Sequence, residues 1–504
     1  MEPEQLVKDG NQVLDVIRCY WEELLQKQFP VLPDMKTITP GYLERTLPQE
    51  APEKGEDFAV ILDDYKKLIL PGLTHWQHPD FHAYYPAACS LPAILGDLLT
   101  NSIGVFVFNW LTCPTATELE VIVLNWLAKA FGLPSKFLYD PNRQDGIGGG
   151  GGTIECNASV ATLTMAMALR NQATKLQCAT TTEEDLLCGR GPGAMAHRSV
   201  VYASDQLNCA VLRTFDLTML RTHVIKSKYV NRRLIFDADD IQKAIEEDRE
   251  KGYVPLMCVA SFGTTNSCEF DNLEEIGLVC QKENLWLHVD AAYAGCALLC
   301  PEFRNLSKGW EFADSICFNP HKMMLVNVDC CVFWVGNHEL LTSTLGMDPV
   351  YLQTVFRGMP DFKNWSINLD RNNRALKLWF TIRKFGLQEI RNLLRKHHQL
   401  ALRFAQLIET DNRFEIVNDV RFGLVCFKLK TSDAANQELL SLLLKERHMY
   451  ITSGSLLDET DETDGGLFLR FVCNHQAELK DIEDAVMIIT KLASQVFLQK
   501  KESN

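Results

Sequence analysis

Near the start of the chain, apolar side chains recur every three or four positions, and this spacing predicts helices. The first such segment covers residues 10–28 and ends before Pro30. A second covers residues 57–69 and ends before Pro71. Between them, residues 34–55 are rich in proline and predict an extended connection. We therefore expect two amphipathic helices, each of which buries one face.

The pattern changes after about residue 90, where short apolar runs alternate with helical segments as far as about residue 335. Residues 285–289 are almost continuously apolar, which is typical of a strand buried in a parallel sheet. Asn272, with Glu275 three positions later, marks a helix start before that strand. This alternation predicts an α/β domain with a mostly parallel sheet. The polar residues 171–197 predict a surface loop.

The C-terminal part predicts a second, smaller folding pattern. A long helix that follows residue 374 is expected to end at Gly386. The segments after it predict a small α+β domain, with strands at 423–429, 449–453 and 467–473 and helices at 437–446 and 479–497. We therefore expect three parts, namely an N-terminal helical segment (1–90), a large domain (91–376) and a small domain (377–504).

Composition and charge exclude several classes of protein. The chain has 504 residues and a formal net charge of −15, which argues against nucleic acid and anionic membranes as partners. No apolar run reaches the roughly 18 residues of a membrane-spanning helix. The N-terminal sequence MEPEQLVKDG is acidic and unlike a signal peptide, so we expect a cytoplasmic protein. Its 17 scattered cysteines are then expected to be reduced.

One lysine lies in an unusual setting within residues 314–335. Lys322 follows His321 directly, and apolar runs flank the pair on both sides. Burial of an ammonium group lowers its pKa and frees the amine as a nucleophile toward carbonyl groups. The alternative is a lysine at the end of a strand whose head reaches water.

A carboxylate in the preceding strand favours the chemical interpretation. Asp290 ends the apolar run 285–289, and Ala291 and Ala292 follow. Ligands of open α/β sheets lie at the carboxyl ends of the strands. A carboxylate there can hold a protonated ring nitrogen, and a small alanine can pack flat under a ring. A Schiff-base lysine with an aspartate partner is the arrangement that pyridoxal phosphate requires.

A glycine-rich stretch, residues 146–159, precedes a predicted helix. Glycines allow the backbone to approach a phosphate closely, and helix N-termini favour anions. The alternative is a flexible loop. The stretch is not a P-loop, because the Gly-Lys-Ser/Thr sequence of that motif does not follow.

HVDAAYAG at residues 288–295, followed by NPHK at 319–322, resembles the pyridoxal-phosphate-dependent group II amino-acid decarboxylases, and most of all the aromatic-L-amino-acid decarboxylases. Further segments that resemble the family in the same order are PGLTHWQHPDFHAYYP (71–86), FNWLTCPTATELE (108–120), SDQ (204–206), FGTT (262–265), CPEFR (300–304), VNVDC (326–330), DPVYL (348–352) and RALKLWF (374–380). The resemblance implies an aspartate-aminotransferase-like (type I) fold, pyridoxal 5′-phosphate as cofactor, and a homodimer with a shared active site. The N-terminal segment would pack across the dimer partner.

The resemblance also implies roles for single residues. Lys322 would bind the cofactor covalently, and Asp290 would keep its ring nitrogen protonated. Tyr351, in a mobile loop, would protonate the substrate Cα across the dimer interface, and His321 would contact the substrate or cofactor. The resemblance implies further cofactor contacts at Asn157, Ala158, Ser159, Asn208, Thr265, Ala292 and Asn319. It implies an aromatic substrate pocket at Trp76, Tyr84, Tyr85, Phe106 and Phe108, although on residue type alone these would be core residues.

Several positions depart from the family pattern. Asn208 stands where the family usually has a histidine over the cofactor ring, and related insect aldehyde synthases resemble this chain there. An amide can stack on a ring but cannot act as an imidazole acid or base. Asp370 stands where a glycine or serine helps to set selectivity, and an acid there favours a substrate with a cation or hydrogen-bond donors. Asn157 and Ala87 are further departures.

Together these patterns predict decarboxylation of an L-amino acid of the aromatic class (DOPA, tyrosine, tryptophan or histidine) to the amine and carbon dioxide. One alternative is an aldehyde synthase on the same scaffold, which decarboxylates its substrate and then uses oxygen to release aldehyde, ammonia and peroxide. Another is a cofactor-binding relative with little turnover. We expect no metal site.

Overall fold

The computed structural model describes residues 2–142, 149–178, 182–183, 192–347, 349–352, 358–455 and 466–502. By its internal contacts the chain forms two compact units. One unit consists of Met1–Pro86 together with His397–Asn504, and the other is Ala87–Lys396. The three-part division expected from the sequence stays a prediction.

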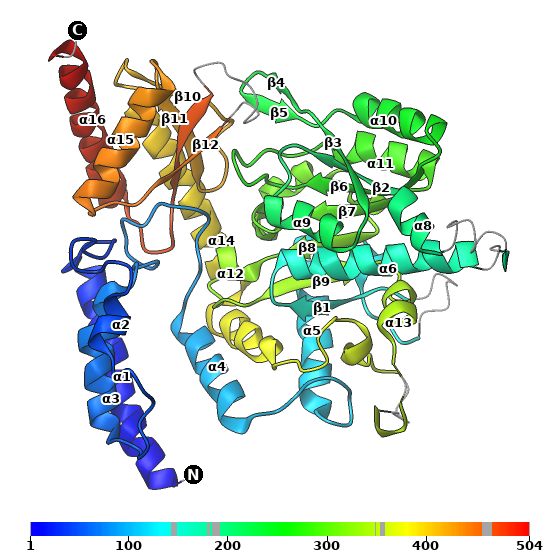
Figure 1. Ribbon diagram of the computed structural model, residues 1–504, viewed down its shortest axis with the longest axis horizontal. Helices are drawn as coiled ribbons and strands as arrows, with labels where there is room; N and C mark the ends of the chain where they lie inside the picture. Colours follow the sequence, from blue (N-terminus) through cyan, green and yellow to red (C-terminus); the bar gives the residue numbers. More distant parts are fainter. Residues whose placement is uncertain are drawn as a thin grey trace. The chain divides into compact units, whose positions relative to one another are not determined.

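The Ala87–Lys396 unit is built on one large sheet (Figure 1). Its strands are β1 (Gly151–Glu155), β2 (Ser199–Ser204), β3 (Arg221–Ile225), β6 (Val254–Ser261), β7 (Trp286–Asp290), β8 (Ser315–Phe318) and β9 (Cys331–Val335). They lie in the order β1-β9-β8-β7-β6-β2-β3. The five strands from β8 to β3 are parallel, whereas β9 is antiparallel to both β8 and β1. The predicted α/β domain with a mostly parallel sheet is confirmed.

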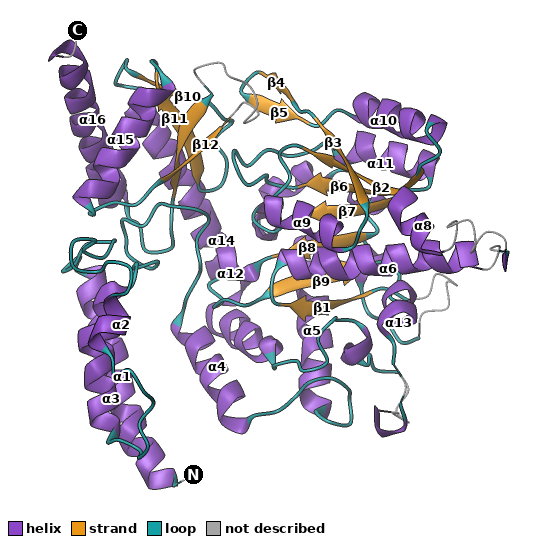
Figure 2. Cartoon of the chain, in the orientation of Figure 1, coloured by secondary structure: helices purple, strands orange, loops and turns teal. Residues whose placement is uncertain are grey.

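Helix α6 (Ala158–Cys178) packs on one face of this sheet (Figure 2). Its buried side chains share a hydrophobic cluster with residues of β2, β6, β8 and β9, among them Cys317. Cys317 lies opposite Asp290 in the β7–β8 register, and side chains alternate between the two faces along a strand. Trp286, His288 and Asp290 therefore point to the face that α6 covers.

Further helices of this unit connect the strands. They are α4 (Leu91–Ile103), α5 (Pro114–Phe131), α8 (Pro192–Arg198), α9 (Cys209–Leu217), α10 (Ala238–Glu250), α11 (Leu273–Glu283), α12 (Pro320–Met323) and α13 (Glu339–Leu345), with the small hairpin β4 (Lys228–Val230) and β5 (Arg233–Ile235). The predicted helix start at Asn272 is confirmed, because its side chain accepts a hydrogen bond from the N–H of Glu275 and caps α11. The loop predicted over 171–197 is wrong at both ends. Helix α6 continues to Cys178, since buried Ala173 extends its apolar face, and α8 begins at Pro192.

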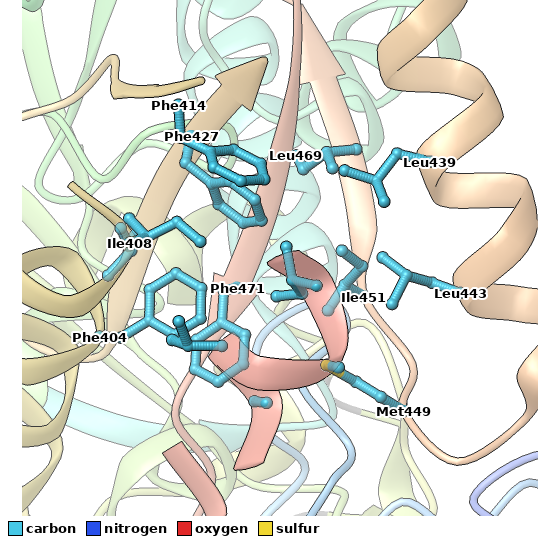
Figure 3. Packing of buried hydrophobic residues seen from close by; sticks show 14 of the residues in the cluster. Phe404, Ile408, Phe414, Phe427, Leu439, Leu443, Met449, Ile451, Leu469 and Phe471 are labelled. Atoms are coloured by element: carbon cyan, nitrogen blue, oxygen red, sulfur yellow. The ribbon is translucent and has the colours of Figure 1, made fainter. Parts of the chain in front are cut away.

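The other unit contains a small antiparallel sheet. Its strands are β10 (Phe414–Ile416), β11 (Leu424–Leu429), β12 (Thr452–Ser455) and β13 (Leu467–Val472), in the order β10-β11-β13-β12. Helices α15 (Asp433–Glu446) and α16 (Leu479–Glu502) belong to the same unit. Figure 3 shows its core, in which the rings of Phe404 and Phe471 stack with centroids 3.9 Å apart. The predicted small α+β fold is confirmed, and β10 is a strand that the sequence pattern did not predict.

The two predicted N-terminal helices are also confirmed. They are α1 (Pro3–Leu25) and α3 (Phe58–Asp64), which continues as a π-helical turn to Ile69, and the short α2 (Tyr42–Thr46) lies between them. Helix α14 (Arg374–Ile408) leaves the helical conformation at Gly386, with φ 67° and ψ 164°, and then resumes. In the part of the chain that the structure describes, no helix has the length and apolar character needed to cross a membrane.

Candidate active site

Lys322 and Asp290 lie at the carboxyl ends of neighbouring strands. Asp290 is the last residue of β7, and β8 leads through Asn319 into the single turn α12 that carries Lys322. The N–H of Asn319 donates to the carbonyl of Ala292 at 3.1 Å, which holds the two strand ends together. The sheet therefore brings the predicted lysine, aspartate, alanine and asparagine to one edge, where ligands of such sheets bind.

The environment of this pair changes both acid–base equilibria. Burial lowers the pKa of Lys322, and the Asp290 carboxylate opposes that shift. Burial also raises the pKa of Asp290, while the nearby Lys322 ammonium and the N–H of Ala292, at 3.0 Å from Oδ1, favour its charged form. A lysine with a lowered pKa is neutral more often than an exposed one, so its amine can act as a nucleophile.

The first turn of α6 can bind an anion. Asn157 precedes the helix, and its Oδ1 accepts a hydrogen bond from the N–H of Val160 at 3.0 Å. The N–H groups of Ala158 and Ser159 lie in the first turn of the helix, where no earlier helical carbonyl can accept their hydrogen bonds. Among the described residues no hydrogen bond to either of them is present, and the side-chain NH₂ of Asn157 is equally without a partner. A phosphate fits such a helix N-terminus.

A second unpaired group lies beside the strand ends. Asn319 is buried, and its Oδ1 has no hydrogen-bond partner in the described parts of the chain. Buried polar atoms are usually paired, so this amide is suited to a bound polar group. The lysine, the carboxylate, the helix N-terminus and this amide together fit a cofactor with a carbonyl group, a basic ring nitrogen and a phosphate.

The described part of the glycine-rich stretch is packed tightly against the rest of the protein. Residues 143–148 lie outside the described residues, and the glycines that follow belong to β1 or precede it directly. A Cβ at Gly150 would collide with the carbonyl of Lys136, and one at Gly151 or Gly152 would press on a tryptophan ring. Gly150, Gly151 and Gly152 therefore allow close packing within the protein.

Asn208 and Thr265, both predicted at the cofactor, are in direct contact. The side-chain Nδ2 of Asn208 donates to Thr265 Oγ1 at 2.9 Å, and its Oδ1 accepts from the N–H of Ala210 at 2.9 Å. Asn208 is thus the N-cap of α9 as well as a neighbour of Thr265. Both side chains retain access to solvent.

His321 is held by the main chain next to Lys322. Its Nδ1 lies 3.1 Å from the N–H nitrogen and 2.8 Å from the carbonyl oxygen of Cys330. Burial and the Lys322 charge lower the pKa of His321 to about 4, so the imidazole is neutral near pH 7. A neutral imidazole can position a ligand without adding charge beside the lysine.

Three of the predicted pocket residues come together within the Ala87–Lys396 unit. The N–H of Val107, between Phe106 and Phe108, donates to the carbonyl of Arg371 at 2.9 Å. Asp370 precedes Arg371 and is exposed, as is Phe106. Two distant segments of the sequence are therefore neighbours at this point.

The remaining predicted pocket residues belong to the other unit. Trp76 and Tyr84 stack with ring centroids 5.5 Å apart, and Tyr85 lies under the guanidinium of Arg470. The Tyr84 hydroxyl lies 2.9 Å from that of Tyr450, a residue that the sequence did not single out. Burial and this contact raise the pKa of Tyr450 to about 12, so it stays protonated at neutral pH.

The predicted proton donor, Tyr351, lies in a short 3₁₀ turn, η7 (Val350–Leu352). Its side chain and residues 353–357 are outside the described part of the structure. Its proposed role stays a prediction.

Sequence reasoning missed an ion pair close to the N-terminus of α6. Arg374 donates to Asp329 Oδ2 at 2.9 Å and to Cys156 Sγ at 3.0 Å. Burial raises the pKa of the Cys156 thiol despite the nearby guanidinium. The signal available in the sequence was the position of Cys156 directly before Asn157.

A cavity of about 700 Å³ lies at the opposite end of the strands. Its walls include Lys136, Trp286 and Asp314, which lie at or near the amino ends of β7 and β8. Catalytic groups of parallel sheets gather at the carboxyl ends, so we place the active site at Lys322 rather than in this cavity.

A parallel α/β sheet whose carboxyl edge carries a buried lysine, a facing carboxylate and a helix N-terminus defines the class of enzymes that bind a carbonyl cofactor through lysine. Comparison with known proteins narrows the class. The family model described as "Pyridoxal-dependent decarboxylase conserved domain" matches residues 40–430. The chain therefore belongs to the pyridoxal-dependent decarboxylase family, whose cofactor is pyridoxal phosphate.

Individual relatives match almost the whole chain. It is 39% identical over 501 residues to the aromatic-L-amino-acid decarboxylase of Bos taurus, covering 98% of this chain and 97% of the relative. It is 38% identical over 457 residues to the 3,4-dihydroxyphenylacetaldehyde synthase of Aedes aegypti, covering 90% of this chain and 83% of the relative. The structure of Catharanthus roseus tryptophan decarboxylase in complex with L-tryptophan matches with a TM-score of 0.86 and 32% identity, over 98% of this chain and 99% of that one.

Proposed function

We propose that this chain removes the carboxylate of an aromatic L-amino acid and releases the amine and carbon dioxide. The observation that carries this proposal is the buried pairing of Lys322 with Asp290 at the carboxyl ends of β8 and β7. Family membership supports the decarboxylation. The aromatic substrates named for relatives support the substrate class.

Pyridoxal phosphate supplies a carbonyl group for the amine and an electron-withdrawing ring that stabilises the charge left at Cα when the carboxylate departs. Lys322 would hold the carbonyl group through Nζ, and Asp290 would keep a proton on the ring nitrogen. The N–H groups of Ala158 and Ser159 would donate to the phosphate, with the Asn157 and Asn319 amides as further partners. Ala292 would pack against the ring.

In this proposal, side chains next to the reacting carbon carry out the proton transfers. The lowered pKa of Lys322 favours the neutral amine, so Nζ can take up and return a proton. In this proposal the protein is a cytoplasmic homodimer. Tyr351 donates the proton to Cα across the dimer interface. His321, neutral and fixed through Nδ1, orients the substrate.

The substrate side chain lies among aromatic residues. Phe106 and Phe108, close to Asp370 in the fold, form one wall in this proposal. An exposed carboxylate at Asp370 attracts a hydroxyl or a ring N–H, so a hydroxylated or imidazole side chain is favoured over phenylalanine.

One observation favours a second candidate, oxidative release of the aldehyde. Asn208 occupies the family's histidine position, and its amide is held by Ala210 and Thr265. It therefore has no proton to exchange at neutral pH. In this reaction the amino acid, oxygen and water give the aldehyde, carbon dioxide, ammonia and hydrogen peroxide. The Aedes aegypti relative is named for such an aldehyde.

The test is a product assay on the purified protein loaded with pyridoxal phosphate. DOPA, tyrosine, tryptophan, phenylalanine and histidine are offered under air, and amine, aldehyde and peroxide are measured together. Amine and carbon dioxide without peroxide establish the decarboxylase. Aldehyde with equal peroxide moves the assignment to the aldehyde synthase. Bound cofactor without turnover contradicts both and leaves a cofactor-binding protein.

A further inference from the structure

Three buried side chains and the half-buried Trp286 form an unbroken line of hydrogen bonds between the sheet and α6. Trp286 Nε1 lies 2.8 Å from Ser315 Oγ, and Ser315 Oγ lies 2.8 Å from His288 Nδ1. His288 Nε2 lies 3.3 Å from Thr162 Oγ1, which in turn lies 3.0 Å from the carbonyl oxygen of Ala158. The line therefore runs from β7 and β8 to the first turn of α6.

The donors and acceptors of this line have one consistent arrangement. An indole N–H can only donate, so Ser315 accepts from Trp286. If the Thr162 hydroxyl donates to Ala158, its oxygen must accept from His288, which places the imidazole proton on Nε2. Nδ1 then accepts the hydroxyl proton of Ser315. The reverse order would leave that buried hydroxyl without an acceptor among the described residues, which is costly.

His288 is suited to this neutral, bridging role. It is completely buried, and burial lowers its pKa to about 3. It points to the same face of β7 as Asp290, two residues later. Cys317 lies between them, with Sγ 3.8 Å from His288 Nε2 and 3.7 Å from Asp290 Oδ1. His288 is therefore linked through Thr162 to the first turn of α6 and through Cys317 to Asp290.

We propose that His288 is a positioning residue that holds the N-terminal turn of α6, where the phosphate binds, in register with the Asp290 carboxylate, where the ring binds. The inference rests on the proposed cofactor contacts and adds the hydrogen bonds that fix the distance between the phosphate site and the ring site. One cofactor molecule must reach both sites, so a shift of α6 relative to β7 weakens its binding. His288 contacts neither the cofactor nor the substrate in this scheme.

The chain offers a matched pair of substitutions for the test. Thr162 and Thr164 are both completely buried on α6, and each hydroxyl donates to the carbonyl four residues earlier, at 3.0 Å and 2.8 Å. Only Thr162 also contacts His288. Thr162→Val and Thr164→Val therefore each remove an equivalent side-chain-to-carbonyl bond within α6. Only Thr162→Val also removes the contact with His288 on the sheet.

The measurement is titration of the apo-protein with pyridoxal phosphate, followed by its absorbance, which needs no turnover. We expect Thr162→Val to raise the Kd about fivefold to tenfold, the effect of one lost buried hydrogen bond, and Thr164→Val to change it less than twofold. Equal Kd values for the two variants would overturn the inference. Thermal melting of both apo-proteins checks that the folds are equally stable.

Substitution of His288 itself gives a second, independent test of the positioning role. His288→Gln keeps an acceptor and a donor at the end of the side chain, whereas His288→Leu keeps neither. We expect the glutamine variant to bind the cofactor more tightly than the leucine variant by at least about threefold, an amount below one full hydrogen bond. A wild-type protein that binds no pyridoxal phosphate would refute the proposed function, whereas tight wild-type binding with equal glutamine and leucine variants would refute only the positioning role.

Discussion

Some side chains that are proposed to contact the cofactor also stabilise the fold, and Asn208 is the clearest case. Its oxygen caps α9 and its nitrogen binds Thr265, so both ends of the amide are committed. A histidine placed there would have to give up one of these bonds or find another geometry. The departure from the family pattern at this position therefore changes local stability as well as acid–base chemistry.

The two functions of Asn208 can be separated by substitution. Asn208→Asp keeps the cap, because a carboxylate oxygen still accepts from Ala210, but it loses the N–H donated to Thr265. Asn208→Ala loses both. We expect only the alanine variant to lose about 1 kcal/mol of unfolding free energy in urea. An aspartate variant as unstable as the alanine variant would show that the Thr265 bond, not the cap, stabilises this region.

Asp271 makes the stability of the protein depend on pH. It is buried beside the end of β6, and burial raises its pKa to about 7, although the N–H of Ser261 donates to it at 2.6 Å. A raised carboxyl pKa favours the protonated form in the folded state. The stabilisation is thus complete below the unfolded pKa of about 4 and is lost as the pH rises through about 7.

Asp271→Asn should remove this dependence, since the amide oxygen still accepts from Ser261 and does not ionise. Between pH 5 and pH 8 we expect the wild type to lose up to about 3 kcal/mol more unfolding free energy than the variant. Urea unfolding at several pH values measures the difference. Parallel curves for the two proteins would contradict the assignment.

At the scale of elements, the sequence predicts best where the pattern and the burial agree. The run 285–289 corresponds to β7 because both faces of a central parallel strand are covered. The loop expected at 171–197 fails because polar residues can continue a helix whose other face is buried. Strand β10, only three residues long, pairs with β11 through its backbone and leaves too short a pattern to detect.

Helix α14 contains a backbone conformation that only glycine adopts easily. Gly386 has φ 67° and ψ 164°, and a Cβ placed there would meet no atom within 4 Å. We expect Gly386→Ala to lower the unfolding free energy by about 1–3 kcal/mol through backbone strain alone. Gly10→Ala is the control, because Gly10 is helical with equally open space and should gain about 0.5–1 kcal/mol. Equal effects in urea unfolding would exclude strain at Gly386.

At the scale of the whole molecule, the sequence could name most of the candidate site but not assemble it. Lys322 and Asp290 carried signals of residue type and context that point to one cofactor. The neighbourhood of Phe106 and Asp370 depends on a contact between segments more than 250 residues apart, for which one sequence gives no pattern. His288 escaped notice because a histidine inside an apolar run resembles a core residue, and its hydrogen bonds depend on α6 and β8.

A homodimer with a shared site makes a quantitative prediction. Lys322→Ala and Tyr351→Phe should each abolish most of the activity. When the two chains are coexpressed, half of the dimers are mixed, and each mixed dimer has one site with both native residues. We expect recovery of about one quarter of the wild-type activity. Activity no higher than that of the separate variants would place Tyr351 and Lys322 of each site on the same chain.

The order of strands in the large sheet also determines when each strand can find its partner during synthesis. Among the described strands β1 pairs only with β9, and β9 separates it from β8. Residues 151–155 therefore have no described strand partner until residues 331–335 exist. At about 5–20 residues per second a ribosome needs roughly 10–40 s to make the intervening segment. During that time the edge strand that leads into α6 is open to wrong pairing. A nascent chain released before Cys331 would carry Lys322 and Asp290 but could not complete the sheet that holds them beside α6.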